Sequence, residues 1–193
     1  FEKVTSDVKV SDEEVKKFYD ENKDSLKQIK VRHILFSTEE GSSEEDKKNA
    51  YNKAKTVIKE LQNGGDFEKI AKEKSEEPGA KESGGLIPEF FTEDTPFLDS
   101  DFVKGAYLLN NIGDFSKEPV ETQFGYHIIK LEEKKETFED LKEDIRFGLL
   151  HQKQNEKYIA YYEEKRNEAK IENILKKEIE EYTKAKTEKK KDE

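Results

Sequence analysis

The sequence predicts an α+β domain in which antiparallel strands pack against short helices. Two short segments, residues 31–36 and 124–131, are rich in β-branched and aromatic residues, which is typical of β-strands. Between them, apolar residues recur at the spacing of amphipathic helices. The order is a strand, then three helices, then two further strands. This order favours one α+β domain over a series of alternating β-α units.

One helix is expected before the first strand. Ser11 is a good N-cap residue, and the three residues after it are acidic, which complements the positive end of the helix dipole. Val15, Phe18 and Tyr19 fall on one face, so we expect this helix to pack against another element. The first strand follows at residues 29–36.

The three helices between the strands each have a start or stop signal. The longest carries apolar residues at i, i+3, i+4 and i+7 spacing over residues 50–61 and ends at Gly64 and Gly65. Asp66 caps a second, short helix, and Asp99 precedes a third.

Two strands complete the predicted domain, a segment with Val120 and Thr122 and the second histidine strand, and a further short strand is possible before the third helix. Residues 86–91 suit a short strand at a sheet edge, because Pro88 has no N–H to donate to a neighbour. In the last strand, alternation places Phe124, Tyr126, Ile128 and Lys130 on one face and His127, Ile129 and Leu131 on the other. His33 lies inside the first strand in the same way, so pairing of the two strands would bring two of the three histidines together.

A long charged helix is expected from Phe138 onward, after a capping-box-like start at Thr137. Its apolar stripe comprises Phe138, Leu141, Ile145, Leu149, Ile159 and Tyr162. A weaker stripe follows at Ile174, Leu175, Ile179 and Tyr182, before a lysine-rich end that we expect to be frayed.

Composition excludes several classes of protein. The net charge of −10 argues against nucleic acid as a partner, because phosphate binding requires a basic surface. The sequence has no run of apolar residues long enough to span a membrane and no Cys, which excludes disulfides and thiolate sites. It also has no Met, so we expect a processed or truncated chain whose signal or anchor lies outside this sequence.

Several motifs between Val31 and Leu131 resemble, in order, those of the parvulin peptidyl-prolyl isomerases. They are Val31-Arg32-His33-Ile34-Leu35, Gly65-Asp66-Phe67, Gly84-Gly85-Leu86, Pro119-Val120 with Thr122, and Phe124-Gly125-Tyr126-His127-Ile128-Ile129. The resemblance implies a parvulin-like domain with a four-stranded antiparallel sheet surrounded by short helices. The flanking helices are similar to those of PrsA-type foldase lipoproteins of Gram-positive bacteria and, more distantly, of SurA-like chaperones.

This resemblance implies three parts. They are an N-terminal helical segment (residues 1–28), the parvulin-like domain (29–134) and a long C-terminal helix (135–193). The two flanking parts would pack together into a lobe that holds unfolded chains. Alternatively, their apolar stripes pair between two molecules in a homodimer.

The resemblance also implies the site residues. His33 and His127 would be hydrogen-bonded to each other beneath the active site, Thr122 would hold the pair, and Glu77 would stand where the family usually has Asp or Cys. Leu86, Leu98, Phe102 and Phe124 would form the pocket for the prolyl ring.

The reaction makes modest chemical demands. The barrier to rotation about an X–Pro bond is ~20 kcal/mol, and a thousandfold acceleration removes only ~4 kcal/mol of it. A small apolar pocket that twists the amide can supply this without a nucleophile, a metal or a cofactor. We expect no metal site at His33 and His127, because zinc needs at least three convergent protein ligands.

Each site residue also has a simpler interpretation when taken alone. A His in an apolar strand is usually a hydrogen-bonded core residue, and Phe102 and Phe124 have the character of core aromatics. Glu77 beside Pro78 suits an ordinary turn. His151 lies on the long charged helix and is expected to be solvated.

The resemblance implies a peptidyl-prolyl isomerase and foldase that assists exported, unfolded polypeptides outside the cytoplasm. The intact protein would be anchored to the membrane of a Gram-positive type cell by a segment absent from this sequence. A non-enzymatic chaperone is the main alternative, because Glu77 and the Gly85–Pro88 segment depart from the family pattern. A coiled-coil adaptor would leave the central motifs unexplained. The acidic loop at residues 39–46 would repel phosphate, so no phosphoserine specificity is expected.

Overall fold

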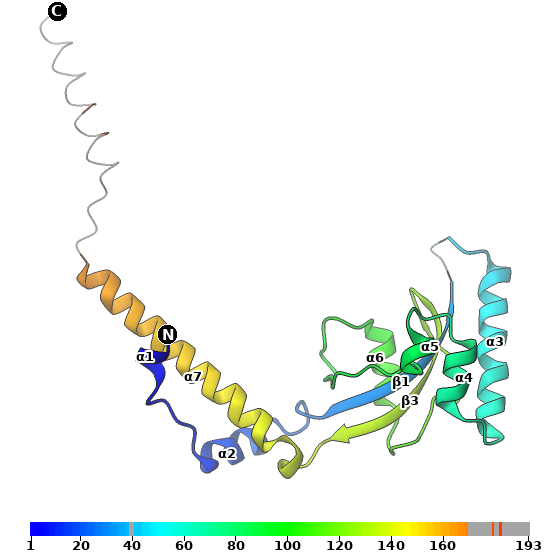
Figure 1. Cartoon of the computed structure of the whole chain (residues 1–193), viewed down its shortest axis with the longest axis horizontal. Coiled ribbons are helices and arrows are strands. Elements are labelled where there is room, and N and C mark those ends of the chain that lie inside the picture. The colour runs from blue at the N-terminus through cyan, green and yellow to red at the C-terminus, as the bar shows by residue number, and fades with distance from the viewer. Residues whose placement is uncertain (39–40, 170–178, 180–181, 183–193) are drawn as a thin grey trace, which may run out of the picture. The chain divides into compact units, whose positions relative to one another are not determined.

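The computed structural model describes residues 1–38, 41–169, 179 and 182. The chain divides into two compact units, one formed by Phe1–Ser11 with Arg146–Glu193 and the other by Asp12–Ile145. The order of the elements can be followed in Figure 1. The predicted apolar positions Ile174 and Leu175 lie outside the described residues, as do Glu39 and Glu40 of the acidic loop.

Within the described chain, three antiparallel strands form one sheet in the unit Asp12–Ile145. They are β1 (Gln28–Ser37), β2 (Val120–Thr122) and β3 (Gly125–Lys135), in the spatial order β1-β3-β2. β1 pairs with β3 from Gln28↔Lys135 to Ser37↔Gly125, with one irregularity between Lys30 and Val31. The long β1–β3 pair is therefore the axis of this unit.

The four-stranded sheet that the family resemblance implies is wrong for the described residues, because residues 86–91 do not form a regular strand. They run beside β1 and touch it through isolated bridges, Ile29↔Phe91 and Arg32↔Leu86. The N–H of Ile87 donates to the carbonyl of Val31, and the N–H of Phe91 donates to the carbonyl of Ile29. The segment thus advances four residues while β1 advances two, and this shift of register breaks the ladder between the bridges.

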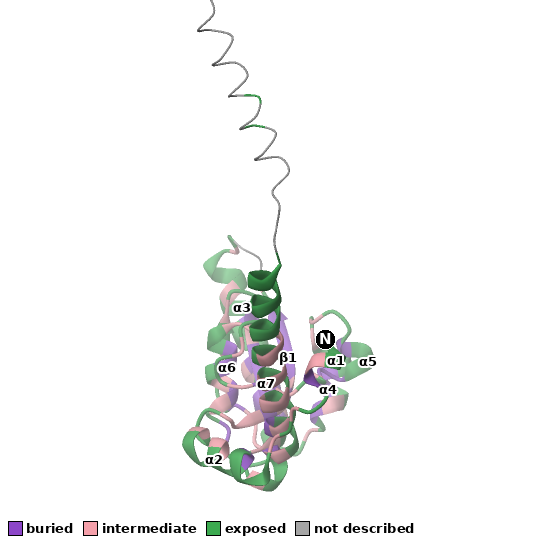
Figure 2. Cartoon of the chain, turned by 90° about the vertical axis from the view of Figure 1, so that its left-hand side faces the viewer, coloured by how far each residue is buried: buried purple, intermediate pink, exposed green. Residues whose placement is uncertain are grey.

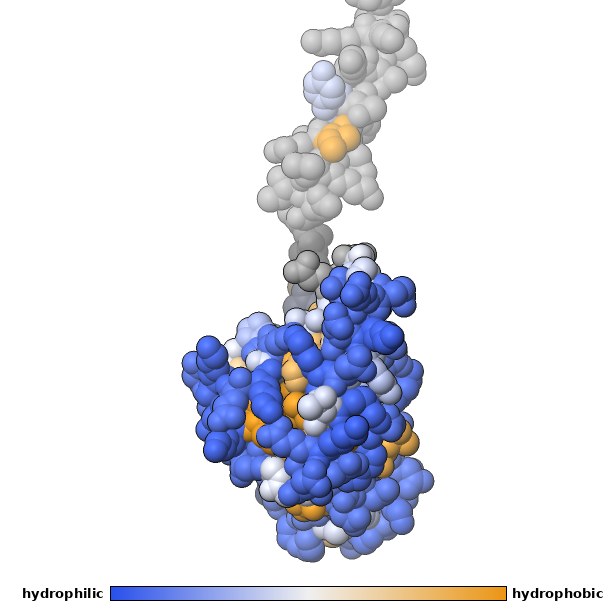
Figure 3. Space-filling view, turned by 90° about the vertical axis from the view of Figure 1, so that its right-hand side faces the viewer, coloured by the Kyte–Doolittle hydropathy of each residue, from blue (hydrophilic) through white to orange (hydrophobic). Residues whose placement is uncertain are grey.

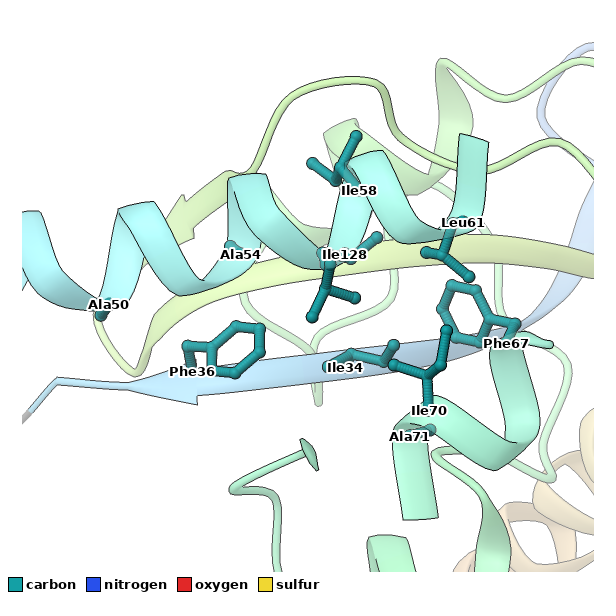
Figure 4. Close-up of a cluster of buried hydrophobic side chains, with 11 residues drawn as sticks. Ile34, Phe36, Ala50, Ala54, Ile58, Leu61, Phe67, Ile70, Ala71 and Ile128 are labelled. Carbon is teal, nitrogen blue, oxygen red and sulfur yellow. The ribbon is translucent and has the colours of Figure 1, made fainter. Parts of the chain in front are cut away.

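Helices cover both faces of the sheet (Figure 1). α3 (Glu44–Gln62) and α4 (Phe67–Lys74) pack on one face. The side chains of this first core come from both helices and from β1 and β3 (Figure 4). Its buried members are Ile34, Phe36, Ala50, Ala54, Val57, Ile58, Leu61, Phe67, Ile70, Ala71 and Ile128.

The other face of the sheet packs against α6 (Ser100–Tyr107). This second core contains Ile29, Val31, Phe91, Phe102, Val103, Ala106, Leu109, Ile129 and Leu131. Because neighbouring residues of a strand point to opposite faces, His127 shares this face with Ile129 and Leu131. The alternation of β3 thus directs one histidine toward α6.

The predicted helix starts are present. Ser43 and Asp46 form a capping box at α3, and the carboxylates of Asp66 and Asp99 accept N–H groups of α4 and α6. α7 (Phe138–Glu168) begins with the same reciprocal arrangement between Thr137 and Asp140. The four-residue helices α1 (Glu2–Thr5) and α5 (Ala80–Ser83) were not predicted.

The flanking helix α2 (Asp12–Asn22) packs against the start of α7. The rings of Tyr19 and Phe138 meet edge to face at 5.5 Å, and the Tyr19 hydroxyl donates to the carbonyl of Glu136. Val15 and Leu141 are fully buried. Within the other unit, the ring of Phe1 lies against Tyr158 of α7, with centroids 5.2 Å apart.

Burial is concentrated in the sheet and its covering helices, whereas much of α7 is exposed (Figure 2). Of the predicted α7 stripe, Leu141 and Ile145 are buried, but Ile159 and Tyr162 are exposed. Hydrophilic residues predominate on the face in Figure 3, as expected for a chain that is 42% charged. Among the described residues, no helix combines the length and the apolar character needed to cross a membrane.

Candidate active site

The strand register brings the two buried histidines together. His33 on β1 lies opposite Ile129, and Leu35 lies opposite His127, so the imidazoles are diagonal neighbours on one face. Their Nδ1 atoms are 3.1 Å apart, and the rings stack with centroids 5.3 Å apart. The exposed fractions are only 8% for His33 and 4% for His127.

Thr122 extends this contact into a chain of hydrogen bonds. Its Oγ1 lies 2.9 Å from Nε2 of His127 and accepts the backbone N–H of Phe124 at 3.1 Å. If the Thr122 hydroxyl donates to Nε2, then Nδ1 of His127 carries a proton and donates to His33. If Nε2 of His127 donates to the Thr122 hydroxyl instead, Nδ1 of His33 donates to Nδ1 of His127. Both rings are neutral in either arrangement.

Burial determines the charge state of the pair. It lowers the pKa of His33 to about 4. Burial, and then the nearby His33, lowers the pKa of His127 to about 3. Both imidazoles are therefore neutral at pH 7, and each Nδ1 can belong to an uncharged donor–acceptor pair.

Phe102 of α6 packs against both imidazoles. Its ring meets His33 and His127 edge to face, with centroid distances of 5.3 Å and 5.1 Å. Asp99 fixes this part of α6 by accepting the N–H groups of Asp101 and Phe102. A single helix cap thus helps to hold the aromatic ring over the histidine pair.

These residues line a cleft with a volume of about 1270 Å³. Seven of the eight predicted site residues line it: His33, Glu77, Leu98, Phe102, Thr122, Phe124 and His127. Phe124 is 55% exposed, because it lies in the turn before β3 and the alternation of that strand does not extend to it.

Leu86 is the predicted pocket residue that does not line the cleft, and Ile87 lines it instead. Leu86 forms its bridge with Arg32, the neighbour of His33 on β1. Adjacent residues of extended chain point to opposite sides, so the next position, Ile87, reaches the cleft and packs on the second core.

Two neighbouring carboxylates at the cleft have different environments. Glu76 accepts the backbone N–H and the hydroxyl of Ser37 and pairs with Lys53 at 2.8 Å. The carboxylate of Glu77 has no hydrogen bond or ion pair with any residue that the structure describes. Burial raises the pKa of Glu77, since nothing nearby compensates its charge.

The sequence did not reveal every residue that lines the cleft. Asp99 was visible only as a helix cap, whereas Phe97, Gln123 and Glu89 lie in irregular segments that have no periodic signal. Gln123 donates to Asp99 at 3.3 Å and so links the start of α6 to the turn that carries Phe124. Within the described residues, no group of three or more His, Asp or Glu is arranged to hold a metal ion.

Comparison with known proteins agrees with this geometry. Residues 33–133 match the domain described as "Rotamase: PPIC-type PPIASE domain". A "Foldase protein PrsA" from Clostridium botulinum is 40% identical over 176 residues, which cover 87% of this chain and 48% of that protein. Another, from Caldanaerobacter subterraneus, is 37% identical over 161 residues, covering 83% of this chain and 47% of that protein.

Among solved structures, a peptidylprolyl isomerase (PrsA) from Bacillus anthracis is 31% identical, with a TM-score of 0.47. The match covers 85% of this chain and 68% of that one. This chain spans about half the length of the two foldases above. Because the rotamase match extends over more than half of the sequence and contains both histidines, this chain belongs to the family of PPIC-type peptidyl-prolyl isomerase domains.

Proposed function

We propose that this chain catalyses cis–trans isomerisation of the peptide bond before proline in unfolded polypeptides. The observation that carries the proposal is the neutral His33–His127 pair beneath a cleft that Phe102 closes on one side. Such an arrangement provides an apolar binding site for a pyrrolidine ring above a rigid pair of hydrogen-bonded imidazoles.

The histidine pair supports the cleft rather than transferring protons. With both pKa values well below 7, neither ring is charged under ordinary conditions, and isomerisation breaks no bond to hydrogen. A fully satisfied buried network instead keeps the cleft rigid. We assign His33, His127 and Thr122 this role.

Leu98, Phe102, Phe124 and Ile87 are proposed to hold the prolyl ring. Clamping the ring against these apolar side chains favours the twisted amide, which has lost its resonance and its planar dipole. Glu77 is proposed to act on the electrostatics of that amide, because its carboxylate has no partner among the described residues and lines the same cleft.

The biological setting follows from the relatives. They are named foldases, so unfolded or partly folded exported polypeptides are the proposed clients. We also propose an extracytoplasmic location, with membrane anchoring through a segment outside this sequence. Residues 29–134 would form the isomerase domain, with 1–28 and 135–193 belonging to a chaperone lobe.

A protease-coupled assay on an Ala-Pro-Phe type peptide tests the isomerase proposal. Phe102→Ala and His127→Ala should each lower kcat/KM on the order of tenfold or more, a loss of about 1.4 kcal/mol in transition-state stabilisation. Ile112→Ala is the matched control, because Ile112 is exposed and does not line the cleft. No acceleration by the intact chain would contradict the proposal.

A chaperone without turnover is the second candidate. The exposed apolar residues Phe147, Ile159 and Tyr162 on α7 favour it, since such residues can hold unfolded chains. Suppressed aggregation of a denatured client, lost on their joint replacement by Ser, would support this function independently of turnover. If these three residues instead pair between two molecules in a homodimer, light scattering would give a mass that depends on concentration.

A further inference from the structure

The charged side chains that line the cleft are strongly unbalanced. Five carboxylates line it, from Glu76, Glu77, Glu89, Asp99 and Glu121, whereas Lys47 is its single ammonium group. Lys47 already pairs at 3.4 Å with Glu44, a residue that does not line the cleft. Because both histidines are neutral at pH 7, no other cation among the lining residues offsets this charge.

The carboxylates differ in how far protein groups already satisfy them. Glu76 is held by Ser37 and Lys53, and Asp99 is used by the backbone of α6 and by Gln123. Glu89 and Glu77 make no ion pair with any described residue. Their negative charge is therefore available to a polypeptide in the cleft.

Aromatic side chains line the same cleft as these carboxylates. Phe97 is 63% exposed and Phe124 is 55% exposed, and both line the cleft. The face of an aromatic ring attracts a cation, and the aliphatic stem of Lys or Arg packs well on it. Exposed rings and unpaired carboxylates in one cleft suit a long cationic side chain and disfavour an anionic one.

We propose that the cleft prefers prolyl segments that carry Lys or Arg directly before the proline, with Glu89 as a specificity-determining residue. This inference rests on the proposed isomerase function, whose cleft it uses. A carboxylate before the proline would meet like charge in a partly desolvated cleft, which costs affinity.

Turnover of three peptides that differ only before the proline, Ala-Lys-Pro-Phe, Ala-Ala-Pro-Phe and Ala-Glu-Pro-Phe, tests the preference. We expect kcat/KM to fall in that order, with a Lys-to-Glu ratio on the order of tenfold at low salt. The ratio should shrink as ionic strength rises, because the cleft is open to solvent. Equal rates for the three peptides would overturn the proposal.

Charge reversal locates the effect. Glu89→Lys should reduce the Lys-to-Glu ratio at least threefold, because it removes one carboxylate from the cleft lining and adds a second ammonium group, which weakens the negative field there. Glu73→Lys is the matched control: Glu73 is exposed on α4, outside the cleft lining, and the substitution changes the net charge equally. An unchanged ratio in Glu89→Lys, or an equal change in both variants, would overturn the assignment.

Binding separates this inference from the isomerase function. The same Lys and Glu peptides, labelled with fluorescein, are titrated with the intact chain and followed by anisotropy. If no peptide turns over but the Lys peptide binds more tightly and Glu89→Lys abolishes the difference, the preference holds while the isomerase function fails. Equal binding of the two peptides in that case would overturn the preference.

Discussion

The buried His33–His127 pair links folding stability to pH. Burial lowers both pKa values, to about 4 and about 3, from an unfolded value near 6.5. Between those limits the unfolded chain binds protons that the folded chain does not, so stability falls as pH decreases through this window. Each unit of lowered pKa corresponds to about 1.4 kcal/mol, and the pair stops contributing to the pH dependence only well above pH 6.5, where the unfolded imidazoles are neutral as well.

Urea unfolding at several pH values between 7 and 5 measures this dependence. We expect the free energy of unfolding to decrease toward pH 5 in the intact chain and in His151→Gln, since His151 is exposed on α7. Replacing both buried histidines with Phe should flatten the profile above pH 5. A steep profile in that double variant would assign the dependence to other groups.

Thr122 makes a second residue-scale prediction. Thr122→Val keeps the shape of the side chain but removes the hydroxyl that contacts Nε2 of His127 and accepts the N–H of Phe124. Leaving these groups without a partner should destabilise the fold by about 1–3 kcal/mol and lower turnover. Thr122→Ser retains the hydroxyl and should recover most of both losses in urea unfolding and in the peptide assay. Equal losses in the two variants would show that the methyl group matters instead.

At the scale of the elements, the turn at Gly84 and Gly85 presses closely against β1. Gly85 has φ +75°, and a Cβ there would lie 2.0 Å from the carbonyl oxygen of His33. The Gly85 carbonyl accepts the N–H of His33 at 2.8 Å, so this turn fixes the strand at the histidine itself. The glycine is needed for close approach as well as for its backbone conformation.

Gly85→Ala should therefore destabilise the chain by more than about 2 kcal/mol, because it adds a backbone clash to the strain of positive φ. Gly113→Ala is the matched control: Gly113 has φ +93°, but a Cβ there meets nothing within 4 Å. It should cost only the conformational strain, about 1 kcal/mol. Thermal or urea unfolding compares the two, and similar losses would contradict the clash.

The helices that the sequence predicted well combine a cap with an apolar stripe. α4, α6 and α7 begin at the expected polar residue, and α3, α4 and α6 bury the expected face, whereas α7 buries only Leu141 and Ile145 of its predicted stripe. α1 and α5 are four residues long, too short for any periodicity to show. The segment 86–91 has strand-like composition, but its register with β1 shifts between Ile87 and Phe91, and composition does not reveal register.

The site was predictable where a chemical signal coincided with a strand. His33 and His127 stood out as polar residues in apolar strands, and antiparallel pairing brought them within hydrogen-bonding distance. No such signal shows which side chains of an irregular segment face the cleft, so Leu86 was predicted to line it in place of Ile87. Glu89 and Phe97 likewise reach the cleft through loop geometry, which the residue pattern does not contain.

For the whole molecule, the cores and the cleft share one stretch of sequence. Every buried member of the two core clusters lies between Ile29 and Leu131, and every residue that lines the cleft lies between His33 and His127. Val15 and Leu141 are fully buried but belong to neither cluster. α2 and the start of α7 thus add a separate layer of packing to the unit Asp12–Ile145.

Two fragments, residues 29–134 and residues 12–145, distinguish a self-sufficient domain from one that needs its flanks. We expect both to unfold cooperatively in urea and to isomerise the same peptides, because the shorter fragment contains both cores. The longer fragment should be more stable by roughly 3–6 kcal/mol, since Val15 and Leu141 are fully buried and each such side chain contributes about 1.5–3 kcal/mol. If residues 29–134 fail to fold while residues 12–145 fold normally, the packing of α2 on α7, with its contact between Tyr19 and Phe138, is an integral part of the domain. The proposed boundary at residue 29 would then move to residue 12, and the flanks would support the cleft rather than form a lobe of their own.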